Sequence, residues 1–235
     1  MNFSLEQFAT RIRFQQLFLC SLAIMVIQSL LADSFWMRQL ISFFYLNALW
    51  VALSASHARP VSRYLFFGLW LVSVVLHTVT LPGHEQMGWL LAKALGAVLL
   101  LICTGSVVSF VLHSKSVSSD TLFAAAIGYL FVADVFGQVY IVLHVLVPGS
   151  FSFAHPVEDA SVWALQHAFN YFSFITLATL GYGDIAPIHP LVRVLASIEA
   201  VVGQFYVAVL VAWLVSRYVR DNEAASDLSD RRDAE

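Results

Sequence analysis

The sequence predicts an all-α membrane protein with six spanning helices and one re-entrant segment. Apolar residues make up 60% of the 235 residues and charged residues only 11%, whereas a soluble domain is about 25% charged. The apolar residues lie in long runs, and a spanning helix needs about 20 of them. Six such helices leave no room for a sizeable soluble core. The net charge of −3 gives no basic footprint for a nucleic-acid partner.

Six apolar runs are long enough to cross a bilayer, and each is expected to be helical because lipid cannot satisfy an open backbone. The first four runs form a bundle over residues 14–112, after a cytoplasmic N-terminus at 1–13. The last two belong to a second domain at 121–219, and residues 220–235 form a short, charged tail that is expected to be disordered. The runs are 14–32, 36–54, 64–81, 87–112, 121–147 and 191–219.

Positive charges in the connections predict the orientation, because Lys and Arg concentrate on the cytoplasmic side. Nine of the 12 lie on the side of the N-terminus if that end is inside, so both termini are expected in the cytoplasm. The nine are Arg11, Arg13, Arg59, Arg63, Lys115, Arg217, Arg220, Arg231 and Arg232, and the other three are Arg38, Lys93 and Arg193.

The connection between the fifth and sixth runs, residues 151–190, is too long for a tight turn. Its apolar stretch at 160–177 is expected to form a helix too short to span the membrane and return. It leads directly into the string T-x-x-T-L-G-Y-G-D at 176–184. Non-helical backbone at membrane depth is tolerated only where protein buries it or water reaches it. A re-entrant helix followed by an extended segment meets that condition.

The residues of this extended segment suit the coordination of a dehydrated cation. Successive carbonyls can point to one axis only if alternate residues take unusual φ values, which Gly181 and Gly183 permit. The carbonyls of Thr179, Leu180, Gly181 and Tyr182, with the Thr179 hydroxyl, would then replace the water shell of K⁺. The C-terminal end of the preceding helix would direct partial negative charge toward the cation.

Residues 176–184 resemble the potassium-channel signature, and 121–219 is similar to the pore module of bacterial channels with six helices and one pore loop per chain. The resemblance implies a selectivity filter at Thr179–Gly183, passive K⁺ conduction and a homotetramer in the lipid of a bacterial inner membrane. It implies no enzyme activity, organic cofactor or small-molecule substrate. Thr176 and Asp184 would support the filter.

The sequence departs from this family at the end of the pore helix. Many members have two tryptophans where Tyr171 and Phe172 stand, and that pair braces the filter from behind. Tyr171 is able to offer its hydroxyl to Asp184, whereas Phe172 offers no hydrogen bond. The fourth run also lacks the repeated arginines of a voltage sensor, since Lys93 is its one basic residue. Lys93 is either a one-charge sensor or a side chain that snorkels to the outer interface.

Other polar residues in the spans leave two interpretations open. Asp134 is a protonatable gate or an acid that packs one helix against another. Glu199 bonds to the back of the pore helix or faces the pore. His155 and His189 flank the filter and act as external proton sensors or are incidental.

The sixth run carries a glycine followed by residues at helical spacing. Gly203 is a hinge or a close-packing site. Gln204, Val207 and Val211 line an inner cavity or form the face that meets other subunits.

Two other classes of protein remain as alternatives. Gly181–Asp184 also matches the G-x-G-D string of intramembrane aspartyl proteases, with Asp134 as the second carboxylate such an enzyme needs. An accessory membrane subunit of another channel is the third hypothesis.

Overall fold

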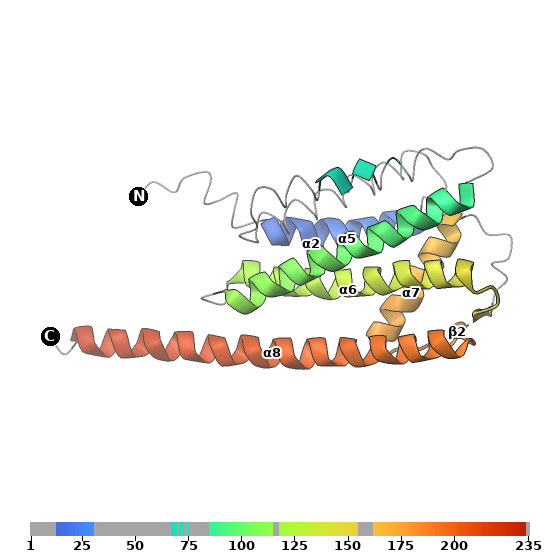
Figure 1. Cartoon of the computed structure of the whole chain (residues 1–235). Coiled ribbons are helices and arrows are strands. Elements are labelled where there is room, and N and C mark those ends of the chain that lie inside the picture. Colours follow the sequence, from blue (N-terminus) through green and yellow to red (C-terminus); the bar gives the residue numbers. More distant parts are fainter. Residues whose placement is uncertain are drawn as a thin grey trace.

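The computed structural model describes residues 13–30, 67–69, 71–72, 75, 85–114, 118–154 and 162–233. Its regular elements are helices and one short ribbon of two strands (Figure 1). The elements are α2 (Arg13–Leu30), α5 (Glu85–His113), α6 (Ser119–Leu146), β1 (Phe151–Phe153), α7 (Val162–Leu177), β2 (Ile185–Pro187) and α8 (Pro190–Asp233).

Three helices are long and apolar enough to cross a membrane: Leu90–His113, Ser119–Leu146 and Pro190–Arg220. A shorter apolar helix covers Phe14–Ile27. Of the other predicted spans, 36–54 lies outside the described residues, and 64–81 is described only at 67–69, 71–72 and 75, where it is helical. The described part of the chain therefore carries three of the six predicted spans.

Helices α2 and α5 pack on α6 of the same chain. The core of this bundle is apolar, and the α2 backbone N–H of Phe14 donates to Asp120 Oδ1 at the start of α6 (3.2 Å). The start of α6 is closed by a capping box, in which Ser118 Oγ accepts from the Thr121 N–H and Thr121 Oγ1 accepts from the Ser118 N–H. Buried members of this core are Phe14, Leu17, Leu99, Leu100, Cys103, Val107, Val111, Ala124, Ala125, Ile127 and Phe131.

A ribbon of β1 and β2 refines the all-α prediction. The strands are antiparallel, with Ser152 opposite Ala186. The ribbon follows the turn that ends α6, where Gly149 takes a φ of 76°. It lies at the end of the molecule opposite the start of α2 and the end of α8 (Figure 1).

The disorder predicted for the tail is wrong, because α8 continues without a break to Asp233. The residues after the span include good helix formers such as Glu223, Ala224 and Ala225. Extending an existing helix also needs no new nucleus. The charged composition of the tail therefore did not predict its secondary structure, because the tail continues an existing helix.

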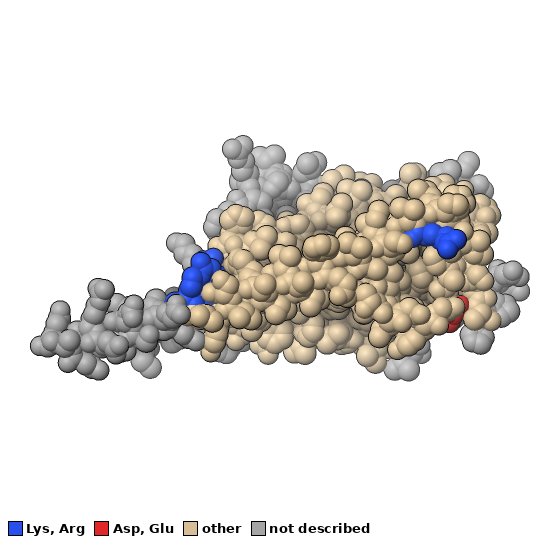
Figure 2. Space-filling view, turned by 90° about the horizontal axis from the view of Figure 1, so that it is seen from below, with Lys and Arg blue, Asp and Glu red and all other residues tan. Residues whose placement is uncertain are grey.

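Charged side chains lie toward the two ends of the described surface, with an uncharged belt between them (Figure 2). This distribution is typical of a protein whose middle is in contact with lipid.

Candidate functional site

The re-entrant helix α7 positions the segment that follows it through its last turn. The Leu180 and Gly181 N–H groups donate to the Ile175 carbonyl, at 2.8 and 3.2 Å, and the Thr179 N–H donates to the Thr176 carbonyl at 2.9 Å. The N–H groups of the first residues after α7 are therefore hydrogen-bonded to carbonyls near the end of that helix. The carbonyls of this segment are not used by those bonds and stay available to a ligand.

Alternate residues of the segment take a left-handed backbone conformation. The φ angles are 58° at Thr179, 55° at Gly181 and 81° at Gly183, whereas Leu180 and Tyr182 between them have negative φ. Such alternation turns successive N–H groups to one side and their carbonyls to the other. Alternation at the two glycines was expected from the sequence. Thr179 was not, because a positive φ is rare for a β-branched residue and persists only where its surroundings impose it.

The ribbon holds the other end of the segment. The Ala154 N–H donates to the Asp184 carbonyl (2.8 Å), and the Ile188 and His189 N–H groups both donate to the Ser150 carbonyl. The filter segment, which we define as residues 179–184, is thus anchored to α7 at one end and to β1 at the other. Its side chains at Leu180 and Tyr182 are 56% and 68% exposed in the single chain.

Behind the filter segment, Tyr171 and Asp184 interact. Desolvation, followed by a hydrogen bond to Asp184 and the charge of that carboxylate, raises the pKa of the Tyr171 phenol. The Asp184 Oδ1 atom is buried and has no hydrogen-bond partner among the described residues. Phe172 is buried between Tyr140 and Phe151, with ring centroids 5.1 and 5.6 Å away. Phe172 therefore packs the back of α7 and offers no polar contact.

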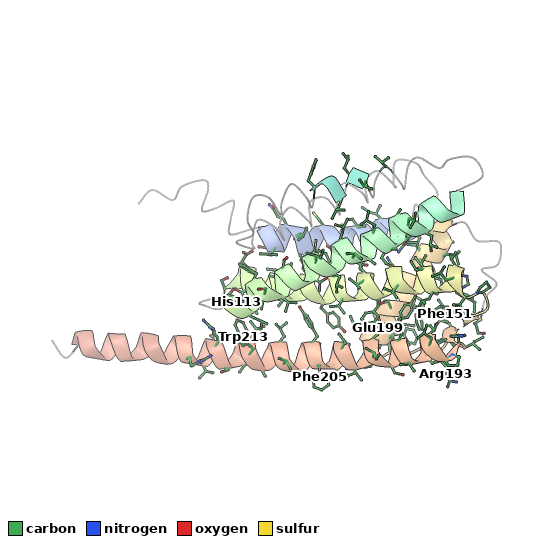
Figure 3. All side chains as sticks on the ribbon, viewed as in Figure 1. His113, Phe151, Arg193, Glu199, Phe205 and Trp213 are labelled. Carbon is green, nitrogen blue, oxygen red and sulfur yellow. The ribbon has the colours of Figure 1, made fainter. Side chains whose placement is uncertain are left out.

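A buried polar network joins three helices behind α7. Tyr140 of α6 donates to Glu199 Oε2 of α8 (2.6 Å), and Ser173 Oγ of α7 contacts Glu199 Oε1 and the Ala133 carbonyl (2.6 Å). Glu199 is fully buried and points from α8 toward the other helices (Figure 3). The alternative of a pore-facing carboxylate is therefore wrong for Glu199.

Helix α8 lies close to the end of α7 at Gly203. A Cβ added there would overlap the carbonyl of Leu177, the last residue of α7, which favours a close-packing role for Gly203. The next residue, Gln204, places its Nε2 atom 3.4 Å from Thr179 Oγ1. Val207 and Val211 follow on α8 and are exposed in the single chain.

The remaining predicted residues lie apart from this cluster. Asp134 is half-buried in the middle of α6, and His189 Nδ1 accepts from the Leu191 N–H at the start of α8 (3.3 Å). His155 lies outside the described residues. Lys93 does not snorkel to the surface: it is only 9% exposed, and its Nζ donates to Gln166 Oε1 of α7. Within the described ranges, no group of three or more His, Cys, Asp or Glu side chains is placed to hold a metal ion.

Comparison of the chain with known protein families finds a match to one family model. A family model described as an ion channel matches residues 121–220, which contain α6, the ribbon, α7, the filter segment and the spanning part of α8. This segment is therefore similar to ion channels. The ion-channel match indicates a channel segment rather than an enzyme, which argues against the aspartyl protease alternative.

A relative of this chain is an inward rectifier potassium channel, Kirbac3.1, of Paramagnetospirillum magnetotacticum. The two chains are 38% identical over 64 residues, which are 27% of this chain and 21% of the relative. The match thus spans about a fifth of the relative's length. No solved structure matches the chain.

Proposed function

We propose that this protein conducts K⁺ passively and selectively across a membrane through a pore built from four copies of the chain. The observation that carries the proposal is the alternation of left-handed φ at Thr179, Gly181 and Gly183. A backbone of this kind presents carbonyl oxygens in successive layers, and such layers replace the hydration shell of K⁺. Residues 179–182, with the Thr179 hydroxyl, are the proposed ion ligands. The potassium-channel relative supports the choice of ion.

Four copies are proposed because one chain supplies only one strand of a ring. Only 11% of the spanning window of α8 is buried inside the chain. Large apolar side chains are exposed along the helix, and Phe205 points away from the bundle (Figure 3). A fourfold arrangement around the filter segments would cover part of this surface, and lipid would cover the rest. The exposed side chains are Leu191, Val194, Ile198, Val201, Phe205, Val207, Val209, Val211, Val215, Tyr218 and Val219.

Opening is proposed to depend only weakly on voltage. A unit charge that crosses 100 mV supplies only about 2.3 kcal/mol, and Lys93 is the one Lys or Arg in α5. The proposed location is a bacterial inner membrane, with both termini in the cytoplasm. A steep conductance–voltage curve, equivalent to several gating charges per subunit, would contradict the proposed weak voltage dependence.

The test is the reversal potential of the purified protein in planar bilayers, with K⁺ on one side and Na⁺ on the other. The decisive variant is Gly181→Ala, and Gly149→Ala is its matched control. Both glycines have positive φ and open space where a Cβ would be added, so both changes carry a similar backbone cost of about 1 kcal/mol. Only Gly149 lies outside the filter segment.

Selective K⁺ current that Gly181→Ala abolishes and Gly149→Ala preserves is the expected result. Equal loss in both variants would mean that the filter segment has no special role. Folded wild-type tetramers that carry no current, and whose thermal midpoint does not rise when K⁺ replaces Na⁺, would favour the accessory-subunit alternative, because a bound ion stabilises the state that binds it.

A further inference from the structure

Lys93 is a buried charged residue of α5 that takes no part in the proposed ion coordination. It lies near the start of the apolar span Leu90–His113, and only 9% of it is exposed. A lysine at membrane depth is costly unless a polar group accepts hydrogen bonds from its ammonium group. Such a residue is a candidate functional residue by default. One acceptor is Gln166 Oε1, 2.5 Å from Lys93 Nζ. Gln166 belongs to α7, the helix that ends in the filter segment.

The contact continues along α7 toward the filter. Gln166 Nε2 donates to Asn170 Oδ1 one turn later (2.8 Å). Asn170 is packed against Gly137 of α6, where an added Cβ would meet Asn170 atoms at 2.5 to 3.4 Å. One turn beyond Asn170 lie Phe174 and Ile175, whose carbonyls accept the N–H groups of Ala178, Leu180 and Gly181.

Two features make this chain of contacts suited to transmit a displacement. Gly137 allows α7 to lie directly against α6, so α7 has little room to move independently of its polar contacts. The Lys93–Gln166 bond is charge-assisted, and such bonds are roughly twice as strong as neutral ones. A shift of α5 relative to α7 would either carry Gln166 with it or break this bond. Breaking the bond is unfavourable, because losing a hydrogen bond to a charged group in a low-dielectric interior costs free energy.

We propose that Lys93 is a positioning residue through which α5 sets the placement of the pore helix, and with it the conducting state of the filter. This inference rests on the proposed function, because it concerns the gating of the K⁺ current. Helix α5 then acts on the filter at the ribbon end of the molecule, through α7 of the same chain. Lys93 acts in this proposal by donating a hydrogen bond to the pore helix. This role does not require the lysine to move across the transmembrane potential.

A double-mutant cycle tests the contact. Lys93→Met and Gln166→Leu each remove one partner while keeping a side chain of similar length, and the double variant removes both. Lys93→Arg keeps a charged donor. Thr104→Val is the matched control, since Thr104 is a buried polar residue of the same helix whose hydroxyl bonds to the Leu100 carbonyl within α5 (2.8 Å). The readouts are single-channel mean open time, the K⁺/Na⁺ reversal potential and the thermal midpoint of the purified protein.

Each single change is expected to alter the mean open time by about threefold or more, and the double variant is expected to change it no further than the larger single effect. Coupled pairs in contact commonly deviate from additivity by about this much or more. Lys93→Arg and Thr104→Val are expected to stay within about twofold of the wild type. The reversal potential is expected to be unchanged in all variants, because the filter ligands are intact.

Several results would overturn the inference. A conducting wild type in which the Lys93 and Gln166 changes are additive, or have no effect on open time, removes this inference and leaves the proposed function standing. If Lys93→Met fails to assemble, the same comparison is made between Lys93→Gln and Lys93→Arg. Equal open times in these two variants, with Gln166→Leu unchanged, would also overturn it. A folded wild type without K⁺ current overturns both the inference and the proposed function.

Discussion

Tyr140 donates a hydrogen bond of 2.6 Å to the carboxyl group of Glu199, and so ties α6 to α8 behind the pore helix. The other carboxyl oxygen contacts Ser173, whose hydroxyl also lies 2.6 Å from the Ala133 carbonyl. Ser173 has one proton, so it cannot donate to both neighbours at once. All three contacts are satisfied together if Glu199 carries a proton and donates it to Ser173, which in turn donates to Ala133.

This proton count predicts that a neutral side chain of the same shape will serve at position 199. Glu199→Gln is expected to keep K⁺ current and to lower the thermal midpoint only slightly, because its amide can donate to Ser173 and accept from Tyr140. Glu199→Ala leaves a cavity and the buried Tyr140 hydroxyl without its partner, which is expected to cost about 2–4 kcal/mol. The measurement is thermal unfolding in detergent together with bilayer current. Equal damage from both variants would show that a carboxylate charge is required.

Gly203 gives a second prediction, because α8 touches the end of the pore helix there. Gly203→Ala is expected to displace Leu177 and to reduce the selective K⁺ current. It is also expected to lower the free energy of unfolding by about 1–3 kcal/mol. The matched control is Gly105→Ala, a helical position in α5 with nothing within 4 Å of the added Cβ. That change is expected to be neutral or to stabilise the helix by about 1 kcal/mol. Normal current and an unchanged thermal midpoint in Gly203→Ala would contradict the packing role.

The filter segment was readable from the sequence because its chemistry is local. Two glycines two residues apart, after an apolar stretch with a helical pattern, predict both the re-entrant helix and the alternation of φ. The structure places that helix at Val162–Leu177, close to the predicted 160–177. The positive φ of Thr179 was not predicted, because the hydrogen bonds at the end of α7 impose it. The conformational preference of a β-branched residue argues against a positive φ.

Contacts between distant segments were not readable in the same way. Lys93 and Gln166 are 73 positions apart, and Ser173 and Glu199 are 26 apart. A single lysine in an apolar run has the same pattern whether it snorkels or is buried against another helix. The signal that was available is the pair Gln166 and Asn170, two amides at i, i+4 on an otherwise apolar helix. That pair marks a polar stripe that needs a buried partner.

Tyr171 gives a third prediction, about the brace behind the filter. Tyr171→Phe removes the hydroxyl that bonds to Asp184, and it is expected to change the mean open time while leaving the reversal potential unchanged. The pKa of this phenol is raised, so the hydroxyl stays protonated and the bond is fully present below about pH 10, the ordinary value for tyrosine. The bond is lost only as the pH rises through the higher pKa of the folded protein. Unchanged single-channel gating in Tyr171→Phe would count against the brace.

Gln204 gives the last prediction, because its amide lies 3.4 Å from the Thr179 hydroxyl at the start of the filter segment. A carboxylate in that place attracts a cation by about 4 kcal/mol at 4 Å near a protein surface. Gln204→Glu is therefore expected to raise single-channel conductance at low K⁺ concentration, and the increase is expected to fade at high salt because exposed charges are screened.

Val211→Glu is the comparison for Gln204→Glu. Val211 is seven residues further along α8, on the same face and about 10 Å away along the axis, which is about one Debye length at 0.1 M salt. A smaller increase in conductance is expected there if both residues line the inner cavity. Conductance that is insensitive to charge at both positions would place this face of α8 against a neighbouring subunit, because a cavity-lining carboxylate would attract the permeant ion.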